Sequence, residues 1–193
     1  MYLCNTQKLS EEIFYQILIF DFENFGKIIF DPPLSVRDLA ILALKSEQSS
    51  WTPKDGPIDD LATKVVDVLT QQSGPLKHYY NLVIKDGMLH SLPLLLEKHK
   101  PSLCFLPRYI FRLVTEVQWH DEKEFFKTFS RETAKFYSDI AKTSPANEWN
   151  WLVEHVIYPA CKNNFMPPQH FSTNKTFLEI ASLPNLYKVF ERC

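Results

Sequence analysis

The strongest β signal of this chain lies near its middle, between segments with helical periodicity. An Asp86-Gly87 pair separates N-L-V-I-K at 81–85 from M-L-H-S-L at 88–92. Apolar residues on both sides of an Asp-Gly pair are typical of a β-hairpin, because both positions of its two-residue turn favour a positive φ. Elsewhere apolar residues recur mainly at helical steps of three and four. Helices and strands do not alternate regularly, so we expect an α+β (mixed α/β) fold.

Cap and breaker residues place the other expected elements. We expect strands over 1–6, 27–30 and 176–181, an apolar edge or loop at 92–96, and helices over 11–25, 36–44, 57–69, 106–117, 121–140 and 148–165. Ser10 and Ser35 are the expected N-caps of the first two helices, and Gly26 is the expected terminator of the first. Pro32-Pro33 and Ser73-Gly74-Pro75 are predicted breaks, and Pro159 is predicted to kink or end its helix.

Composition narrows the class of protein. At 193 residues, with 45% hydrophobic and 14% aromatic residues, the chain is long enough for one domain or two small lobes around a core. The net charge of −2 does not indicate a nucleic-acid clamp. No run reaches the roughly 18 apolar residues of a membrane span, and no secretory signal is evident. Four scattered cysteines predict reduced thiols in the nucleus or cytosol.

Motifs for catalysis are weak. Four glycines form no phosphate-binding loop, and the histidines form no H-x-x-x-H or H-E-x-x-H pair. His120-Asp121-Glu122 could bind a metal, but carboxylates at a helix start are better explained as caps. A stand-alone thiol or metal enzyme would use Cys193 or Cys161 with His155 or His170. A helical cysteine between apolar residues is more often part of a core.

Aromatic residues gather around the segment 119–137. They are Trp119, Phe125, Phe126, Phe129, Phe136 and Tyr137. Such a stripe could stack nucleobases, but stacking sites usually have clustered Lys and Arg. Here charges of both signs lie between the aromatics, so we favour a stripe that faces the core.

The last eleven residues, L-P-N-L-Y-K-V-F-E-R-C, end on a cysteine. Leu183, Leu186, Tyr187 and Phe190 recur at helical steps and form one apolar face. This face either packs on the chain itself or docks on a partner. The Cys193 thiol beside the terminal carboxylate is a soft metal ligand that could be delivered to a neighbour.

Several long segments in order resemble one family. They include K-L-S-E-E-I-F-Y-Q-I-L-I-F-D-F-E-N-F-G (8–26), S-L-P-L-L-L (91–96), R-L-V-T-E-V-Q-W (112–119), W-N-W-L-V-E-H-V-I-Y (149–158), P-P-Q-H-F (167–171) and the last eleven residues. Together they resemble the C-terminal domain of the eukaryotic MutL homologues that form the non-endonuclease subunit of MutLα, a DNA mismatch-repair heterodimer. The resemblance covers essentially the whole chain.

The resemblance implies a two-lobed dimerisation domain in a nuclear repair complex. Residues 1–35 plus 148–193 would form the dimerisation lobe and 36–147 the external lobe. The domain would bind an endonuclease-bearing MutL partner and have no cofactor of its own, while zinc or another divalent metal sits in the partner. Leu183, Leu186, Tyr187 and Phe190 would dock on the partner, and Phe190, Glu191 and Arg192 would support Cys193 beside that metal.

Further expectations concern what this chain lacks and what else it docks. Peptides of an exonuclease and other repair factors would dock near Glu122. The endonuclease signature, D-Q-H-A followed by E-R, is absent, so we expect a subunit that supports cutting and is not itself an enzyme. The family's N-terminal ATPase domain and the beginning of its C-terminal domain are also expected to be missing. We expect neither strong nucleic-acid binding nor membrane association.

Overall fold

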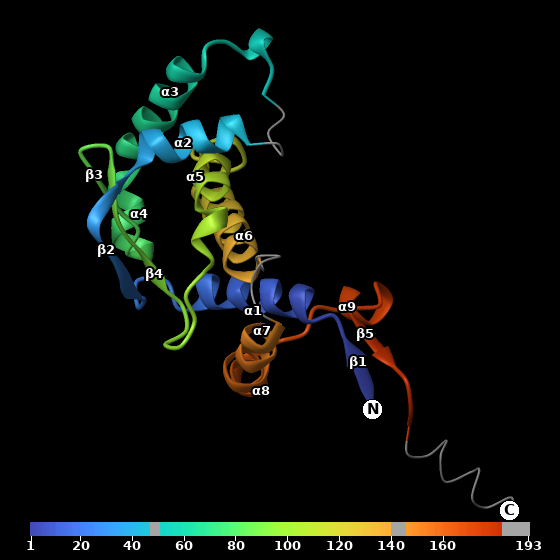
Figure 1. The fold of residues 1–193 in the computed structure, drawn as a ribbon. Helices are drawn as coiled ribbons and strands as arrows, with labels where there is room; N and C mark the ends of the chain where they lie inside the picture. The colour runs from blue at the N-terminus through green and yellow to red at the C-terminus, as the bar shows by residue number, and fades with distance from the viewer. Residues whose placement is uncertain (47–50, 140–145, 183–193) are drawn as a thin grey trace, which may run out of the picture.

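The structure is a computed structural model that describes residues 1–46, 51–139 and 146–182, and it has a mixed α+β fold (Figure 1). In chain order its elements are β1 (Tyr2–Cys4), α1 (Thr6–Phe20), β2 (Gly26–Ser35), α2 (Val36–Lys45), η1 (Pro53–Asp55), α3 (Ile58–Gln71), α4 (Ser73–Tyr80), β3 (Val83–Lys85), β4 (Met88–Leu94), η2 (Leu103–Phe105), α5 (Leu106–Thr115), α6 (Glu122–Ser138), α7 (Ala146–Leu152), the π-helical turn η3 (Val153–Ile157), α8 (Tyr158–Asn164), α9 (His170–Thr173) and β5 (Phe177–Glu179).

The strands of the described residues form two separate antiparallel sheets. One has the order β2-β4-β3, and the other pairs β1 with β5. The predicted hairpin is confirmed, since Asp86 and Gly87 join β3 to β4 with φ values of 51° and 70°. Figure 1 shows α1 crossing the molecule between the two sheets, with β1 at one end and the β2–β4 sheet near the other. α1 therefore links the two sheets, and each sheet pairs strands that lie far apart in the sequence.

The core lies where α1 packs against α6. Phe14 and Leu18 of α1 and Phe129 of α6 are fully buried, and the rings of Phe14 and Tyr137 have centroids 5.7 Å apart. The predicted core-facing stripe is confirmed for Phe125, Phe129, Phe136 and Tyr137, which are buried, while Trp119 and Phe126 are half-buried. Burying large apolar side chains removes their surface from water, which is the main favourable contribution to folding.

The predicted boundaries of the first helix are wrong. Asn5, not Ser10, is the N-cap, and its side chain accepts a hydrogen bond from the Lys8 amide at 3.0 Å. Ser10 lies inside the helix, where its hydroxyl donates to the Thr6 carbonyl at 2.7 Å. A serine can therefore bond to the preceding turn and need not start a helix. The helix ends at Phe20, before the predicted terminator.

Gly26 begins β2 instead of ending α1. A Cβ at this position would lie 3.2 Å from the Leu94 side chain of the paired strand, so the glycine allows a close approach of β2 to β4. The predicted strand at 27–30 exists but continues to Ser35 through Pro32 and Pro33. The two prolines fall at an irregularity in the pairing with β4. β2 is an edge strand, where a missing N–H group is tolerated.

Two further predicted breaks are present, each with a helix on both sides. The Ser73-Gly74-Pro75 segment follows the end of α3, as predicted, but it also opens a second helix, α4. Proline is compatible with the first turn of a helix, because the N–H groups there have no intrahelical partner. Pro159 lies at the start of α8, directly after the π-helical turn η3. The regular α-helical pattern is therefore interrupted just before Pro159, as predicted.

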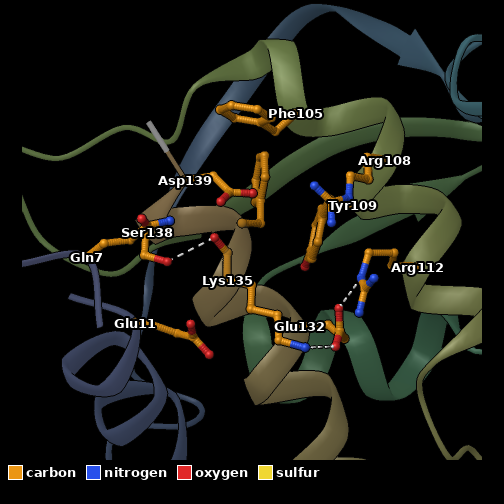
Figure 2. Close-up of a pocket in the computed structure, with 11 residues that line it drawn as sticks. Gln7, Glu11, Phe105, Arg108, Tyr109, Arg112, Glu132, Lys135, Ser138 and Asp139 are labelled. Atoms are coloured by element: carbon orange, nitrogen blue, oxygen red, sulfur yellow. Dashed lines mark hydrogen bonds and ion pairs between the residues drawn. The ribbon is translucent and has the colours of Figure 1, made fainter. Parts of the chain in front are cut away.

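A charged triad joins α5 to α6 (Figure 2). Arg112 donates to the Glu132 carboxylate at 2.5 Å, and the Lys135 ammonium donates to the same carboxylate at 2.6 Å. Burial by itself would raise the pKa of Glu132, but the hydrogen bonds from Arg112 and Lys135 outweigh it and lower this pKa. Since Glu132 is buried, the two cations keep its charge from being left uncompensated.

We predict that Glu132→Gln lowers the free energy of unfolding by about 1–3 kcal/mol at neutral pH, because it removes charge-assisted bonds inside the protein. Glu124→Gln, which breaks the exposed pair with Lys127, should change it by less than about 1 kcal/mol. Urea unfolding of the three chains measures both effects.

The contribution of Glu132 to the free energy of unfolding should depend on pH with a defined sign. The pKa of Glu132 is lowered in the folded chain, so its contribution is present above the unfolded pKa and is lost as pH falls through the folded pKa. The difference between wild type and Glu132→Gln should therefore shrink in this acidic range. A difference that stays constant down to acid unfolding would contradict the triad's role.

Candidate functional site

An exposed apolar surface covers the small β1–β5 sheet. Its members, named here the β1–β5 surface, are Met1, Tyr2, Leu3, Leu178 and Ile180, which are between 44% and 73% exposed. Leu3 and Leu178 face each other in the register of the two strands, so their side chains lie on one face of the sheet. Neighbouring exposed apolar side chains of this size are typical of interaction sites.

An open groove of about 830 Å³ adjoins the same sheet. Its lining includes Tyr2 and Leu178 of the β1–β5 surface together with Cys4, Phe177, Pro167, Pro168 and Phe171. Phe171 is buried and packs edge-on against Phe177, with ring centroids 5.6 Å apart. A two-stranded sheet is only marginally stable without cover. The groove and the β1–β5 surface together leave apolar area for another chain segment to bury.

Backbone hydrogen bonds hold the two strands at this place. The Met1 amino group donates to the Ala181 carbonyl at 2.6 Å, and the Asn5 amide donates to the Thr176 carbonyl at 2.9 Å. These bonds lie at opposite ends of the pair. The last described residues are therefore attached to the first ones, and both termini of the described chain meet at the β1–β5 surface (Figure 1).

Gln16 of α1 fixes the wall of the groove. Its side-chain amide donates to the Met166 carbonyl at 2.7 Å and accepts from the Met166 amide at 3.0 Å. The same amide bonds Glu12 at 3.2 Å, and Arg131 of α6 bonds Glu12 at 3.0 Å. Because Gln16 and Glu12 are buried, these bonds are well protected from water. They position the segment that continues into Pro167 and Pro168.

A second candidate region lies around Glu122. This residue is exposed in the first turn of α6, one helical turn before Phe126, so the two share a face of the helix. The Phe126 ring contacts Phe22 and Tyr79, with centroid separations of 5.5 and 4.9 Å. Phe22 is still 40% exposed. The Glu122 side chain is thus on the same helix face as Phe126, which belongs to a partly exposed aromatic cluster.

The metal-binding alternative at the start of α6 has a structural explanation. The Asp121 side chain accepts a hydrogen bond from the Glu124 amide at 2.8 Å and is the N-cap of the helix, as the sequence predicts. Over residues 1–46, 51–139 and 146–182, no group of three or more His, Cys, Asp or Glu side chains is placed to hold a metal ion.

The charged cleft of Figure 2 lies between α1, α5 and α6 and encloses only about 100 Å³. Arg112 and Lys135 are already bonded to Glu132 there. Burial raises the pKa of Glu11 and of Asp139 in the same cleft. The size of the cleft and its internal ion pairs indicate a structural junction instead of a substrate site.

The alternative thiol site at Cys161 is not assembled in the described part of the chain. No hydrogen bond joins Cys161 to His155 or His170; those two rings lie near Trp151 and Phe171 respectively. Burial, with a smaller effect of Cys4, raises the pKa of the Cys161 thiol to about 11. A thiol with a raised pKa is a poor nucleophile at neutral pH.

The predicted tail residues cannot be placed. Leu183, Leu186, Tyr187, Phe190, Glu191, Arg192 and Cys193 lie outside the described residues. β5, which precedes them, is placed and confirms the predicted strand at 176–181 in part.

The helices of the described residues include none with the length and apolar character needed to cross a lipid bilayer.

Sequence reasoning missed the β1–β5 groove and the role of Gln16. Strands were predicted at both ends of the chain, but their pairing was not, because it joins segments far apart in the sequence. Gln16 stands among the apolar residues of α1. A polar side chain on an otherwise apolar helix face was the available signal, since a buried amide requires partners.

Comparison with known proteins agrees with the resemblance seen in the sequence. The whole chain, residues 1–193, matches the family described as DNA mismatch repair protein Mlh1 C-terminus. It is 31% identical over 219 residues to DNA mismatch repair protein Mlh1 of Dictyostelium discoideum, covering 100% of this chain and 25% of that protein.

Two yeast proteins are also similar. Identity is 34% over 220 residues with DNA mismatch repair protein MLH1 of Saccharomyces cerevisiae, covering 100% of this chain and 28% of that protein. It is 28% over 201 residues with the putative MutL protein homolog 1 of Schizosaccharomyces pombe, again covering 100% and 28%. The chain spans about a quarter of the length of these curated relatives. It belongs to the family of C-terminal regions of the DNA mismatch repair protein Mlh1.

Proposed function

We propose that this chain is a heterodimerisation module of DNA mismatch repair that binds an endonuclease-bearing MutL homologue. The observation that carries the proposal is the β1–β5 surface with its adjoining groove of about 830 Å³. Family membership supports a role in mismatch repair. An exposed apolar sheet face next to an apolar groove supports association with another protein, because burying it would release apolar area from water.

The proposed partner surface continues into the end of the chain. Ile180, Ala181 and Ser182 follow β5 and lead in sequence directly to Leu183. We assign residues 1–35 and 148–193 to a dimerisation lobe and 36–147 to an external lobe. Leu183, Leu186, Tyr187 and Phe190 then extend the apolar contact to the partner.

The tail would also support the partner's metal site. Cys193 is a thiolate donor for zinc or another divalent metal held by the partner, with Phe190, Glu191 and Arg192 positioning it. A nearby divalent cation lowers the pKa of a thiol and so favours the ligating form. This chain supplies no catalytic group of its own in the proposed complex, and its site of action is the nucleus.

Glu122 and the aromatic cluster form the proposed docking site for repair-factor peptides. Phe22, Tyr79 and Phe126 offer an apolar contact, and the Glu122 carboxylate offers an ion pair at its edge. A peptide of an exonuclease or another repair factor with aromatic and basic residues would complement both features. The overall charge of −2 supports protein partners over direct DNA binding.

We predict that the double variant Leu3→Glu, Leu178→Glu weakens the complex with the C-terminal domain of an endonuclease-bearing MutL homologue by more than tenfold. Two carboxylates would have to be buried in the interface, and truncating central contacts typically costs about 2 kcal/mol or more. Light scattering on a sizing column, with a titration of the partner, measures the one-to-one complex and its affinity.

Leu103→Glu is the matched control, because Leu103 is 52% exposed in η2 of the proposed external lobe. It should leave the affinity unchanged. Equal affinities for the double variant and the control would remove the β1–β5 surface from the proposal. A wild-type chain that never forms a complex would overturn the dimerisation module itself.

Deleting Phe190–Cys193 should reduce metal-dependent nicking by the complex, because it removes both the thiol and the residues proposed to position it. Cys193→Ser should reduce nicking while leaving partner affinity near that of wild type. Nicking of supercoiled DNA and the light-scattering titration separate the two effects. Survival of both nicking and full affinity after the deletion would show that the tail has no such role.

Charge reversal at Glu122→Arg should weaken binding of an exonuclease peptide by about tenfold, since it replaces an attractive ion pair by a repulsive one. Glu116→Arg, an exposed position before α6, serves as the control. Fluorescence anisotropy of a labelled peptide gives the affinities. Similar losses for both variants would indicate only a general charge effect.

A further inference from the structure

An apolar groove of about 410 Å³ lies between the end of α2 and the start of α5. It is lined by Leu42, Ala43, Ser46, Cys104, Phe105, Pro107 and Arg108. Leu42 is 57% exposed, and Leu103 next to the groove is 52% exposed. The groove is separate from the β1–β5 surface and from the Glu122 region, with which it shares no residue. Its size and lining suit a bulky apolar side chain.

Arg108 is the single charged side chain among the lining residues. It is exposed and forms no hydrogen bond with the described residues through its guanidinium. Figure 2 shows Arg108 and Asp139 in the neighbouring charged cleft. Burial raises the pKa of Asp139 even though Arg108, Arg112 and Lys135 act in the opposite direction. Arg108 has the largest of these three opposing effects, but no hydrogen bond joins its guanidinium to Asp139, so its donors can bind another carboxylate.

The start of α5 adds positive character to the same end of the groove. No side chain caps this helix, and its first turn contains no acidic residue. By contrast, α2 has Asp38 and α6 has Glu122 and Glu124 in the first turn. The N-terminal end of a helix dipole attracts negative charge, and here no acidic residue of the turn meets that attraction.

We propose that the groove binds a short peptide segment of a partner protein in which an acidic residue directly follows a bulky apolar residue. The apolar side chain occupies the space between Leu42 and Phe105, and the carboxylate pairs with Arg108 at the start of α5. Charge complementarity selects this occupant, because the apolar lining ends at a cation and carries no anion. This site does not depend on the proposed pairing with an endonuclease-bearing homologue.

Cys104 makes the groove directly testable, since it is exposed and lines the site. The probe is acetyl-Cys-Gly-Leu-Asp-amide, supplied as its mixed disulfide with 2-mercaptoethanol. The Cys104 thiolate attacks the peptide sulfur, the protein–peptide disulfide forms, and 2-mercaptoethanol leaves. In excess 2-mercaptoethanol, the labelled fraction reports how well the groove holds the peptide. Intact mass and peptide mapping assign the label among the four cysteines.

Two related peptides test each half of the recognition. One replaces Asp by Asn, and the other replaces Leu by Gly. Labelling of Cys104 by the Leu-Asp peptide should exceed labelling by either relative about two- to fivefold, the range of one partly exposed ion pair or apolar contact. Equal labelling by all three peptides would overturn the proposal.

Arg108→Gln should reduce labelling by the Leu-Asp peptide to the level of the Leu-Asn peptide. Arg37→Gln, an exposed arginine that pairs with Asp59 outside the groove, is the matched control and should keep the preference. A preference that persists in Arg108→Gln would overturn the role of this residue. A dimer of this chain that dissociates upon Leu42→Glu would assign the groove to a second copy and would also overturn the proposal.

Discussion

The packing of α1 against α6 is the interaction on which the other parts of the molecule depend. Phe14 and Leu18 bury completely against a helix that contributes Phe129, and Arg131 of α6 stacks on Tyr15 while it bonds Glu12. Through Gln16 this helix pair also fixes Met166. The buried interface between α1 and α6 therefore positions both the wall of the β1–β5 groove and the helix that begins at Glu122. Loosening it would disturb both proposed binding regions together.

Local chemistry made part of this fold predictable. The Asp86-Gly87 turn needs two positive φ values, and Ser35 can cap a helix whatever the rest of the chain does. The failures came from tertiary contacts. Gly26 is explained by the close approach of Leu94 and not by a helix end, and Ser10 is buried inside a helix that Asn5 starts. The spacing of residues in the sequence could not reveal that Leu94 approaches Gly26 or that Ser10 would be buried inside the helix.

The position of the candidate site could not be predicted from the sequence. The apolar spacing of the last residues indicated a docking segment, and those residues lie outside the described ones. The β1–β5 groove forms only because Tyr2 pairs with Glu179 and Cys4 pairs with Phe177. These partners lie near opposite ends of the chain, so the periodicity of neighbouring residues does not reveal that they pair. Glu122 was inferred from the family resemblance. Its aromatic neighbours Phe22 and Tyr79 come from other segments and required the fold.

The β1–β5 surface, the Glu122 region and the groove between α2 and α5 differ in charge, so they suit different partners. The β1–β5 surface is apolar and extends over two paired strands, so it suits a broad protein interface. The Glu122 region combines an anion with aromatic rings, whereas the groove between α2 and α5 combines the Arg108 cation with apolar side chains such as Leu42 and Phe105. The peptides proposed for these last two sites therefore carry opposite charges. Under both proposals, a peptide selected by one site would be rejected by the other, so two different peptides would bind without competing.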